Sequence, residues 1–420
     1  MRDHFDKTFA SSLPLHVIQS APMSTASPGV IRLLESRTHN TRNWQCKVFY
    51  KPISRFVPHP RRESALRRDL QNESVPVSLS ANGVFRLFAN CVPVKGIRRS
   101  TLCDLQNGLW CFIPNALHFI LTELKDLTIK EIQAHFGSGD HLPIIDGYFR
   151  FLIGNEFGFI CDEPERFPCI DFSFVRPEQI TNAIIDVDKN SDHPWDDILS
   201  QLSDLGCRAL QLRFFSETSA EQLDRILHMT HPYTLCHIDV VVPYLPGFSD
   251  QTLLQIVDRY PAVSKINVHS APATRDIESP PNVKRVFFTH ERCESSSHCG
   301  LVHAANFVVN MEHFSEAQDH NTCLNRKISI DAHGTIRNCP AFSISYGNVR
   351  SVRLAEAVGL KTFQDPWKIR KDDIKICRSC EFRYICTDCR AFLSDSSDVL
   401  SKPATCSYDP SSAAWSDDDA

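Results

Sequence analysis

Apolar and polar positions follow different patterns along the chain, and the changes divide it into segments. Residues 1–83 show no sustained period and are rich in Ser, Pro, Arg and Asn, with 12 Lys and Arg against 6 Asp and Glu. Such a segment buries too little apolar surface to offset the entropy of ordering it, so we expect a disordered extension. A basic arm for an acidic partner is the functional alternative.

Residues 84–168 change to short, aromatic-rich runs, followed by apolar residues at helical spacing. Three hairpin strands are predicted from the runs FRLFANCVPVKG, RRSTLCDLQ and GLWCFIP, which Gly96 and the Asn107-Gly108 pair separate. Three helices are predicted from NALHFILTEL, TIKEIQAHF and residues 143–157. Together they form a small winged-helix-like α+β unit.

A unit of this shape can bind DNA through a helix or a peptide through an exposed strand edge. The second predicted helix, which contains Lys130, Glu131 and His135, is not basic, and the chain has a formal net charge of −5. We therefore favour peptide recognition over nucleic-acid binding. A purely structural role is the remaining alternative.

Residues 169–315 repeat a buried strand and an amphipathic helix. Continuous apolar runs rich in Val, Ile and Phe predict strands at residues 180–188, 208–215, 234–244, 263–271, 284–290 and 306–314. Helices are predicted at residues 195–206, 219–229 and 249–260. This array predicts an α/β fold with a parallel sheet curved into a partial (βα) barrel.

Titratable side chains stand near the expected carboxyl ends of these strands, where such barrels place their active groups. They are Asp186, Asp188, Arg213, Glu217, His237, Asp239 and His269. The two aspartates of the first strand could bind a metal, act as acid and base, or cap a loop. His237 and Asp239 share a strand face, as a paired site or a satisfied polar pair. Arg213 could bind a carboxylate or phosphate, or form a buried salt bridge.

Seven cysteines near the C-terminus form the most specific motif, C-x10-G-x4-C, then C-x2-C-x5-C-x2-C, then C-x16-C. They are Cys323, Cys339, Cys377, Cys380, Cys386, Cys389 and Cys406. Two-residue spacing directs successive sulfurs to a common point, and the residues between them are polar, so metal ligation is favoured over disulfides and over ordinary core thiols. We assign residues 316–408 to a metal-binding domain and residues 409–420 to a disordered acidic tail.

Seven ligands cannot complete two four-thiolate sites, which makes Cys299, in the sequence SHCG, the candidate for an eighth. The other cysteines lack this spacing and are interpreted mostly as core thiols: Cys46, Cys91, Cys103, Cys111, Cys161, Cys169, Cys207, Cys236 and Cys293. Seventeen cysteines in one chain suit a reducing compartment, where thiolate ligation prevails over disulfides. Without an apolar stretch of roughly 20 residues or a secretion signal, the sequence predicts a soluble, cytoplasmic protein with no membrane partner.

The residues ISIDAHGTIRNCPAFSISYGNV and CRSCEFRYICTDCRAF resemble the SPASM domain, the auxiliary iron-sulfur module of peptide-modifying radical-SAM enzymes. With FRLFANCVPVKGIRRSTLCDLQ, ITNAIIDVD and LGCRALQLRFF, the chain more narrowly resembles the SPASM-domain peptide maturases of grasp-with-spasm systems. The resemblance covers residues 84–408. It implies a partial barrel of the radical-SAM type, an ATP-grasp ligase and a precursor peptide as partners, and maturation of a ribosomally made natural product. The N-terminal unit would resemble a leader-peptide recognition element.

The resemblance also implies the ligands of two auxiliary [4Fe-4S] clusters. One set is Cys377, Cys380, Cys386 and Cys406, and three ligands of the other are Cys323, Cys339 and Cys389. The chain departs from the family where S-adenosylmethionine would bind. It has no C-x3-C-x2-C motif, and residues 189–192 after the first strand contain no cysteine. A Gly-Gly-Glu run after the second strand is missing too, since Ser216-Glu217 stands there.

Two alternatives stay open from the sequence. The first is a noncatalytic adaptor of the ligase that four-thiolate zinc sites stabilise, since zinc uses similar cysteine spacings. The second is a radical-SAM enzyme whose catalytic cluster is displaced. That enzyme would need several of four cysteines to converge in space: Cys161, Cys169, Cys207 and Cys236.

Overall fold

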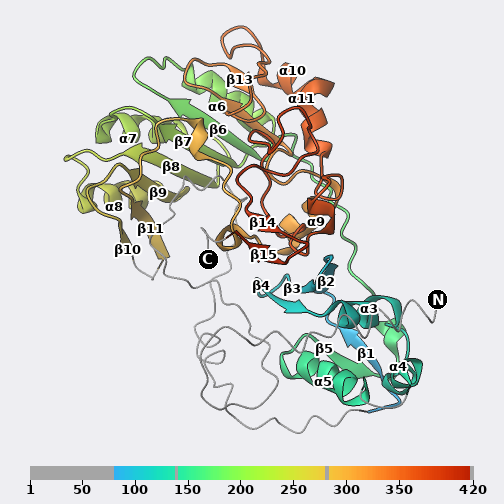
Figure 1. The fold of residues 1–420 in the computed structure, drawn as a ribbon. Coiled ribbons are helices and arrows are strands. Elements are labelled where there is room, and N and C mark those ends of the chain that lie inside the picture. Colours follow the sequence, from blue (N-terminus) through green and yellow to red (C-terminus); the bar gives the residue numbers. More distant parts are fainter. Residues whose placement is uncertain (1–79, 138–140, 280–282, 417–420) are drawn as a thin grey trace.

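The computed structural model describes residues 80–137, 141–279 and 283–416 (Figure 1). The predicted extension over residues 1–83 therefore lies outside the described residues, apart from its last four. The described chain has three parts: an N-terminal unit, a large central sheet, and a cysteine-rich C-terminal segment that lies between them (Figure 1).

The N-terminal unit contains the three predicted hairpin strands. They are β2 (Cys91–Lys95), β3 (Ser100–Asp104) and β4 (Leu109–Ile113), paired antiparallel in that order. Gly108 enters β4 with a φ of 71°, a left-handed conformation that favours glycine. The start of the first predicted strand separates from this sheet as β1 (Val84–Leu87), which pairs with β5 (Gly158–Cys161).

The three predicted helices of this unit are also present, as α3 (Asn115–Glu123), α4 (Ile129–Phe136) and α5 (His141–Gly154). A capping box starts α4, because Thr128 and Glu131 each accept a hydrogen bond from the other's backbone N–H. The apolar faces of the helices pack on the sheet around a buried core that includes Leu102, Leu117 and Phe149.

The central sheet has eight strands, in the order β10-β11-β9-β8-β7-β6-β12-β13. The six inner strands are parallel and both outer strands are antiparallel, so the sheet is mixed. The strands are β6 (Asn182–Val187), β7 (Ala209–Phe214), β8 (His237–Pro243), β9 (Val263–His269), β10 (Arg275–Ser279), β11 (Val283–Phe288), β12 (Lys327–Ile330) and β13 (Ile336–Arg337). Since β10 and β13 are not paired with each other, the described sheet is open and forms no closed barrel.

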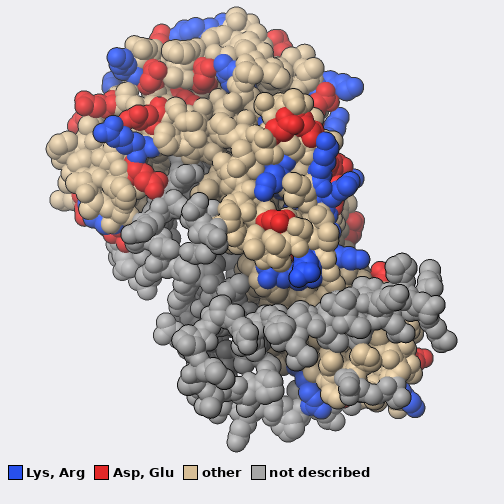
Figure 2. Space-filling model, in the orientation of Figure 1, with Lys and Arg blue, Asp and Glu red and all other residues tan. Residues whose placement is uncertain are grey.

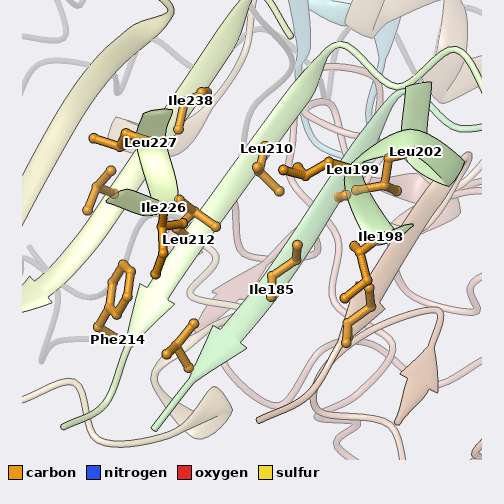
Figure 3. Packing of buried hydrophobic residues seen from close by; sticks show 14 of the residues in the cluster. Ile185, Ile198, Leu199, Leu202, Leu210, Leu212, Phe214, Ile226, Leu227 and Ile238 are labelled. Carbon is orange, nitrogen blue, oxygen red and sulfur yellow. The ribbon is translucent and has the colours of Figure 1, made fainter. Parts of the chain in front are cut away.

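One face of the sheet carries the main apolar core. The predicted helices α6 (Trp195–Asp204), α7 (Ala220–Met229) and α8 (Asp250–Arg259) cover it. Figure 3 shows Ile185, Leu210 and Leu212 of the strands against Leu199 and Ile226 of the helices. Ser219 and Ser249 cap α7 and α8, because their side chains accept hydrogen bonds from the N–H groups of Gln222 and Thr252.

The opposite face of the sheet is polar, because side chains alternate along a strand. We call it the polar face. Its buried members are Asn182, Asp186, Gln211, Arg213, Asp239, His269, Lys327 and Ser329. Burial of so many polar groups requires partners for them, and those partners define the candidate sites described below.

The sixth predicted strand, residues 306–314, is wrong. Its first residue ends a 3-10 helix (Ala304–Asn306), and its last four residues begin α9 (Met311–Asp319). Asn310 decides this, because its side chain accepts a hydrogen bond from the N–H of His313 and caps the helix. The sixth parallel strand is β12 instead, so the proposed boundary at residue 316 divides the sheet.

The C-terminal segment is built mostly from turns and short helices. The helices of this segment are α10 (Leu354–Gly359), α11 (Lys361–Gln364) and the 3-10 helices Asp365–Lys368 and Cys377–Ser379. Two more 3-10 helices, Pro164–Arg166 and Ser296–His298, lie earlier in the chain. Such irregular structure is typical of chains that ligands or polar contacts hold together.

The predicted disorder of residues 409–420 is wrong for residues 409–416. The short strands β14 (Tyr408–Asp409) and β15 (Ala414–Trp415) pair antiparallel. Trp415 anchors the pair, since its ring lies 5.0 Å from that of Tyr408, centroid to centroid. Among the described residues, no helix is both long enough and apolar enough to cross a bilayer.

Candidate metal centre

The C-x2-C-x5-C motif brings three thiols together with a fourth from the end of the segment. The N–H of Cys380 donates to the carbonyl of Cys377 at 2.9 Å, and that of Cys386 donates to the carbonyl of Phe382 at 2.8 Å, so the chain turns back tightly at each step. Cys377 and Cys386 each interact electrostatically with Cys406. Cys380 interacts electrostatically with Cys377 and with Cys386. We call these four residues the first thiol group.

A second thiol group gathers Cys299, Cys323, Cys339 and Cys389. Cys323 interacts electrostatically with each of the other three, and Cys339 with both Cys299 and Cys389. Gly300, with a φ of 90°, lies so close that a Cβ there would be 2.6 Å from the Sγ of Cys389. The structure therefore places Cys299 beside the three cysteines that the resemblance implies as ligands of one cluster.

Burial raises the pKa of several thiols in both groups. It raises the pKa of Cys386 in the first group and of Cys339 in the second to about 12. Burial is also the main cause of the raised pKa of Cys299, Cys377, Cys380 and Cys389. A metal would have to displace these protons, because the thiolate is the ligating form.

Two buried cations and one carboxylate lie against the first thiol group. Asp388 is 3.1 Å from Lys371 Nζ and 2.9 Å from Arg390 Nη2, and the three side chains are at most 6% exposed. Asn321 and the N–H of Cys389 also donate to Asp388. These contacts lower the pKa of Asp388, although its burial opposes the shift. The three side chains together carry one positive charge.

A buried lysine, Lys327, donates a hydrogen bond to the second thiol group. Lys327 is 2% exposed, and its Nζ donates to the Sγ of Cys323 at 3.4 Å. Within residues 80–137, 141–279 and 283–416, no carboxylate forms a salt bridge with it. Burial alone would lower the pKa of Lys327, but the thiols around it outweigh burial and raise it. Sequence reasoning missed Lys327, although a lysine opening the apolar strand KISI is an unusual feature.

The donors in both thiol groups are four cysteines, the set that structural zinc sites and iron-sulfur clusters use. No group of three or more His, Cys, Asp or Glu side chains in the described parts of the chain could hold a single metal ion. The four thiolates of a zinc site must reach one atom, at roughly 2.3 Å each. The thiolates of a [4Fe-4S] cluster bind four different irons and lie further apart.

Asp186 and Arg213 form a buried salt bridge on the polar face. Arg213 Nε and Nη2 donate to the two carboxylate oxygens at 2.7 and 2.8 Å, and neither side chain is more than 6% exposed. Of the two uses expected for Arg213, this geometry corresponds to the structural one. Arg213 also interacts electrostatically with Cys299, which places the second thiol group over this end of the polar face.

Asp188 closes the loop after β6. Its carboxylate accepts from the N–H of Asn190 at 2.7 Å and from Ser191 Oγ at 3.2 Å. Glu217, after β7, is exposed. His269 is buried at the end of β9, and burial lowers its pKa, which keeps the imidazole neutral. The interpretation of Asp188 as a loop cap agrees with the structure, because its carboxylate accepts the hydrogen bonds of Asn190 and Ser191.

His237 and Asp239 are correctly paired but wrongly placed by the sequence. His237 Nε2 lies 3.3 Å from Asp239 Oδ1, and its Nδ1 lies 2.7 Å from Ser264 Oγ. Because His237 is the first residue of β8, the pair lies at the amino ends of the strands, away from the end where barrels place active groups. The error arose because the predicted strand began three residues early.

The four cysteines of the displaced-cluster alternative lie on separate elements. Cys161 ends β5 in the N-terminal unit, and Cys169 is exposed in the connection to the sheet. Cys207 is buried in the apolar core beneath the helices, whereas Cys236 is exposed before β8. This placement gives the alternative no support.

No protein-family model matches the chain, and no curated protein matches it.

Asp186→Asn should destabilise the protein by about 3–5 kcal/mol, because it removes the carboxylate charge that Arg213 pairs with in the interior. The free energy of unfolding in urea measures this. Asp192→Asn is the matched control: Asp192 pairs with Arg350, but its side chain is 93% exposed, so the change should be small. Equal effects of the two substitutions would contradict the account of the polar face.

In the native protein at neutral pH, iodoacetamide should alkylate the exposed Cys169 and Cys236 first. Cys207 should react only on unfolding, since it is inaccessible and burial raises its pKa to about 12. Peptide mass spectrometry over a time course distinguishes the three sites. Early labelling of Cys207 would show that its surroundings are not packed as described.

Proposed function

We propose that the chain is a peptide-maturation protein whose two thiol groups each hold an auxiliary [4Fe-4S] cluster, and which acts with an ATP-grasp ligase on a ribosomally made precursor peptide. The observation that carries the metal assignment is the unbalanced positive charge buried beside each thiol group. The peptide and ligase partners rest on the resemblance to SPASM-domain peptide maturases.

An occupied centre and an empty centre differ in net charge, and this difference decides whether the buried cations are compensated. A buried ammonium without an anionic partner costs several kcal/mol, and protonated thiols offer only weak acceptors. Four thiolates outweigh the charge of the iron-sulfur core that they ligate, so an occupied centre is anionic and compensates Lys327. The same holds for the excess charge of Lys371 and Arg390. Disulfides would leave both charges unmatched.

The N-terminal unit is attached to the first thiol group at one edge of its sheet. Ile97, just after β2, donates to the carbonyl of Ser379, and Thr101 Oγ1 donates to that of Glu381 at 2.8 Å. Arg99 pairs with the buried Glu381 at 2.9 Å. These contacts fix the unit against the loop between two of the proposed cluster ligands.

The other edge of this sheet, β4, is the place we propose for the peptide. No described residue other than those of β3 forms a backbone hydrogen bond with β4. An extended peptide could pair with β4 as a fourth strand, as in other cases of strand addition. Where Figure 2 leaves the described residues uncovered, Lys and Arg are interspersed with Asp and Glu.

The chain itself supplies no site for reductive cleavage of S-adenosylmethionine under this proposal. The loop after β6 contains Asp188 and Ser191, which bond to each other, where a radical-SAM enzyme would have cysteine ligands. The role left to the chain is to bind and position the peptide, with the clusters giving rigidity or carrying electrons. The second candidate function is therefore a noncatalytic, zinc-stabilised adaptor of the ligase, which the missing motif favours.

Anaerobically reconstituted protein should be brown and contain about eight irons, four for each cluster. Cys299→Ser and Cys406→Ser should each remove one cluster, lowering the iron content by half. Cys169→Ser, at an exposed cysteine outside both groups, should leave it unchanged. A colourless protein with stoichiometric zinc would instead establish the adaptor.

Binding of the precursor peptide should slow hydrogen exchange of the amides of β4 (Leu109–Ile113), because half of a strand's N–H groups point to its open edge. Amides of β3 have partners on both sides already and should change less. Exchange measured with and without peptide tests this. Absence of binding would overturn the peptide role, whereas protection confined to another element would overturn only the strand-edge site.

A further inference from the structure

Lys327 is the only residue of its strand that carries a charge, and it points to the polar face. The first residue of β12, it is paired in register with Asn182 of β6, so the sheet fixes its backbone. Asn338 adds to this, because its side-chain amide donates to the Lys327 carbonyl at 2.7 Å. The backbone of Lys327 is thus held by two separate contacts.

The surroundings of that ammonium are thiols. Its Nζ lies 3.4 Å from Cys323 Sγ, and it interacts electrostatically with Cys299 and Cys339 as well. Asp186, an acidic residue on the polar face, accepts hydrogen bonds from Arg213 at both carboxylate oxygens. The positive charge of Lys327 is therefore directed to the second thiol group, at a depth where water screens it little.

We propose that Lys327 raises the reduction potential of the centre held by the second thiol group. This role rests on the proposed function. One-electron reduction adds a negative charge to the centre, and a fixed cation in a dry site favours the more negative state. The N–H donated to Cys323 acts in the same direction, because hydrogen bonds to ligand sulfurs withdraw charge from a cluster.

The two thiol groups differ in this respect. Lys371, beside the first group, already has a carboxylate partner in Asp388, although Arg390 shares it. Among the described residues, Lys327 has no carboxylate partner that would offset its charge. A neutral substitution at this position therefore removes one full positive charge from beside the second thiol group. The proposal consequently predicts a change at one centre and none at the other.

The test is an anaerobic redox titration with dithionite, followed by electron paramagnetic resonance, of reconstituted full-length protein. Lys327→Met should shift the potential of one centre to more negative values and leave the other unchanged. Lys327→Arg keeps the charge and should restore most of the potential. The shifted centre should be the one that Cys299→Ser removes.

Lys327→Gln serves where the methionine variant does not fold, because glutamine retains a donor for Cys323. It should shift the potential in the same direction, since the charge is lost. Unchanged potentials in a neutral variant that holds both clusters would overturn the tuning role, and a shift of the other centre would overturn its location. Protein that takes up no iron would instead overturn the proposed function, and this role with it.

Discussion

Positive charge buried next to sulfur is the constraint on which the structure depends. Lys327 and the pair Lys371 and Arg390 lie in the interior with one carboxylate, Asp388, among them. A protein interior tolerates such charges only beside compensating anions. The cysteines are the groups close enough to supply that compensation, and they do so only as thiolates. The stability of the C-terminal segment is therefore linked to the ionisation of its cysteines.

The central sheet shows how the rest of the chain accommodates this constraint. Its apolar face packs on three helices, as in any α/β protein, whereas its polar face is buried too and must be satisfied within the molecule. The salt bridge of Asp186 with Arg213 satisfies one end, near Cys299. The pairing of β12 with β6 brings Lys327 to the second thiol group. The polar face and the thiols thus form one continuous buried region.

The N-terminal unit is tied to the same region through the loop of the first thiol group. Arg99 stacks on Phe112 and pairs with Glu381, whose carboxylate also accepts a hydrogen bond from Tyr408. Glu381 lies between Cys380 and Cys386, so a rearrangement of the thiols would reach the sheet of the N-terminal unit. This connection gives a physical reason why peptide recognition and an iron-sulfur segment would occur in one chain.

How much of this could be predicted depended on the range of the interactions involved. The helices α3 to α8 and the inner strands other than β12 followed from local periodicity, and the cysteine spacing identified seven of the eight grouped thiols. Cys299 joins them from 24 residues before Cys323, a separation that no short motif contains. The predicted strand at residues 306–314 failed because the cap at Asn310 outweighed an apolar run. Lys327 and Lys371 could not be found from spacing, since only the fold brings them to the thiols.

Native mass spectrometry of the protein purified without oxygen tests the central claim most directly. The account predicts the mass of the chain plus two [4Fe-4S] clusters, with all eight grouped cysteines lacking their protons. A mass equal to the unmodified chain, or one lowered by disulfide formation, would contradict it. In that case the buried cations would need a different source of negative charge.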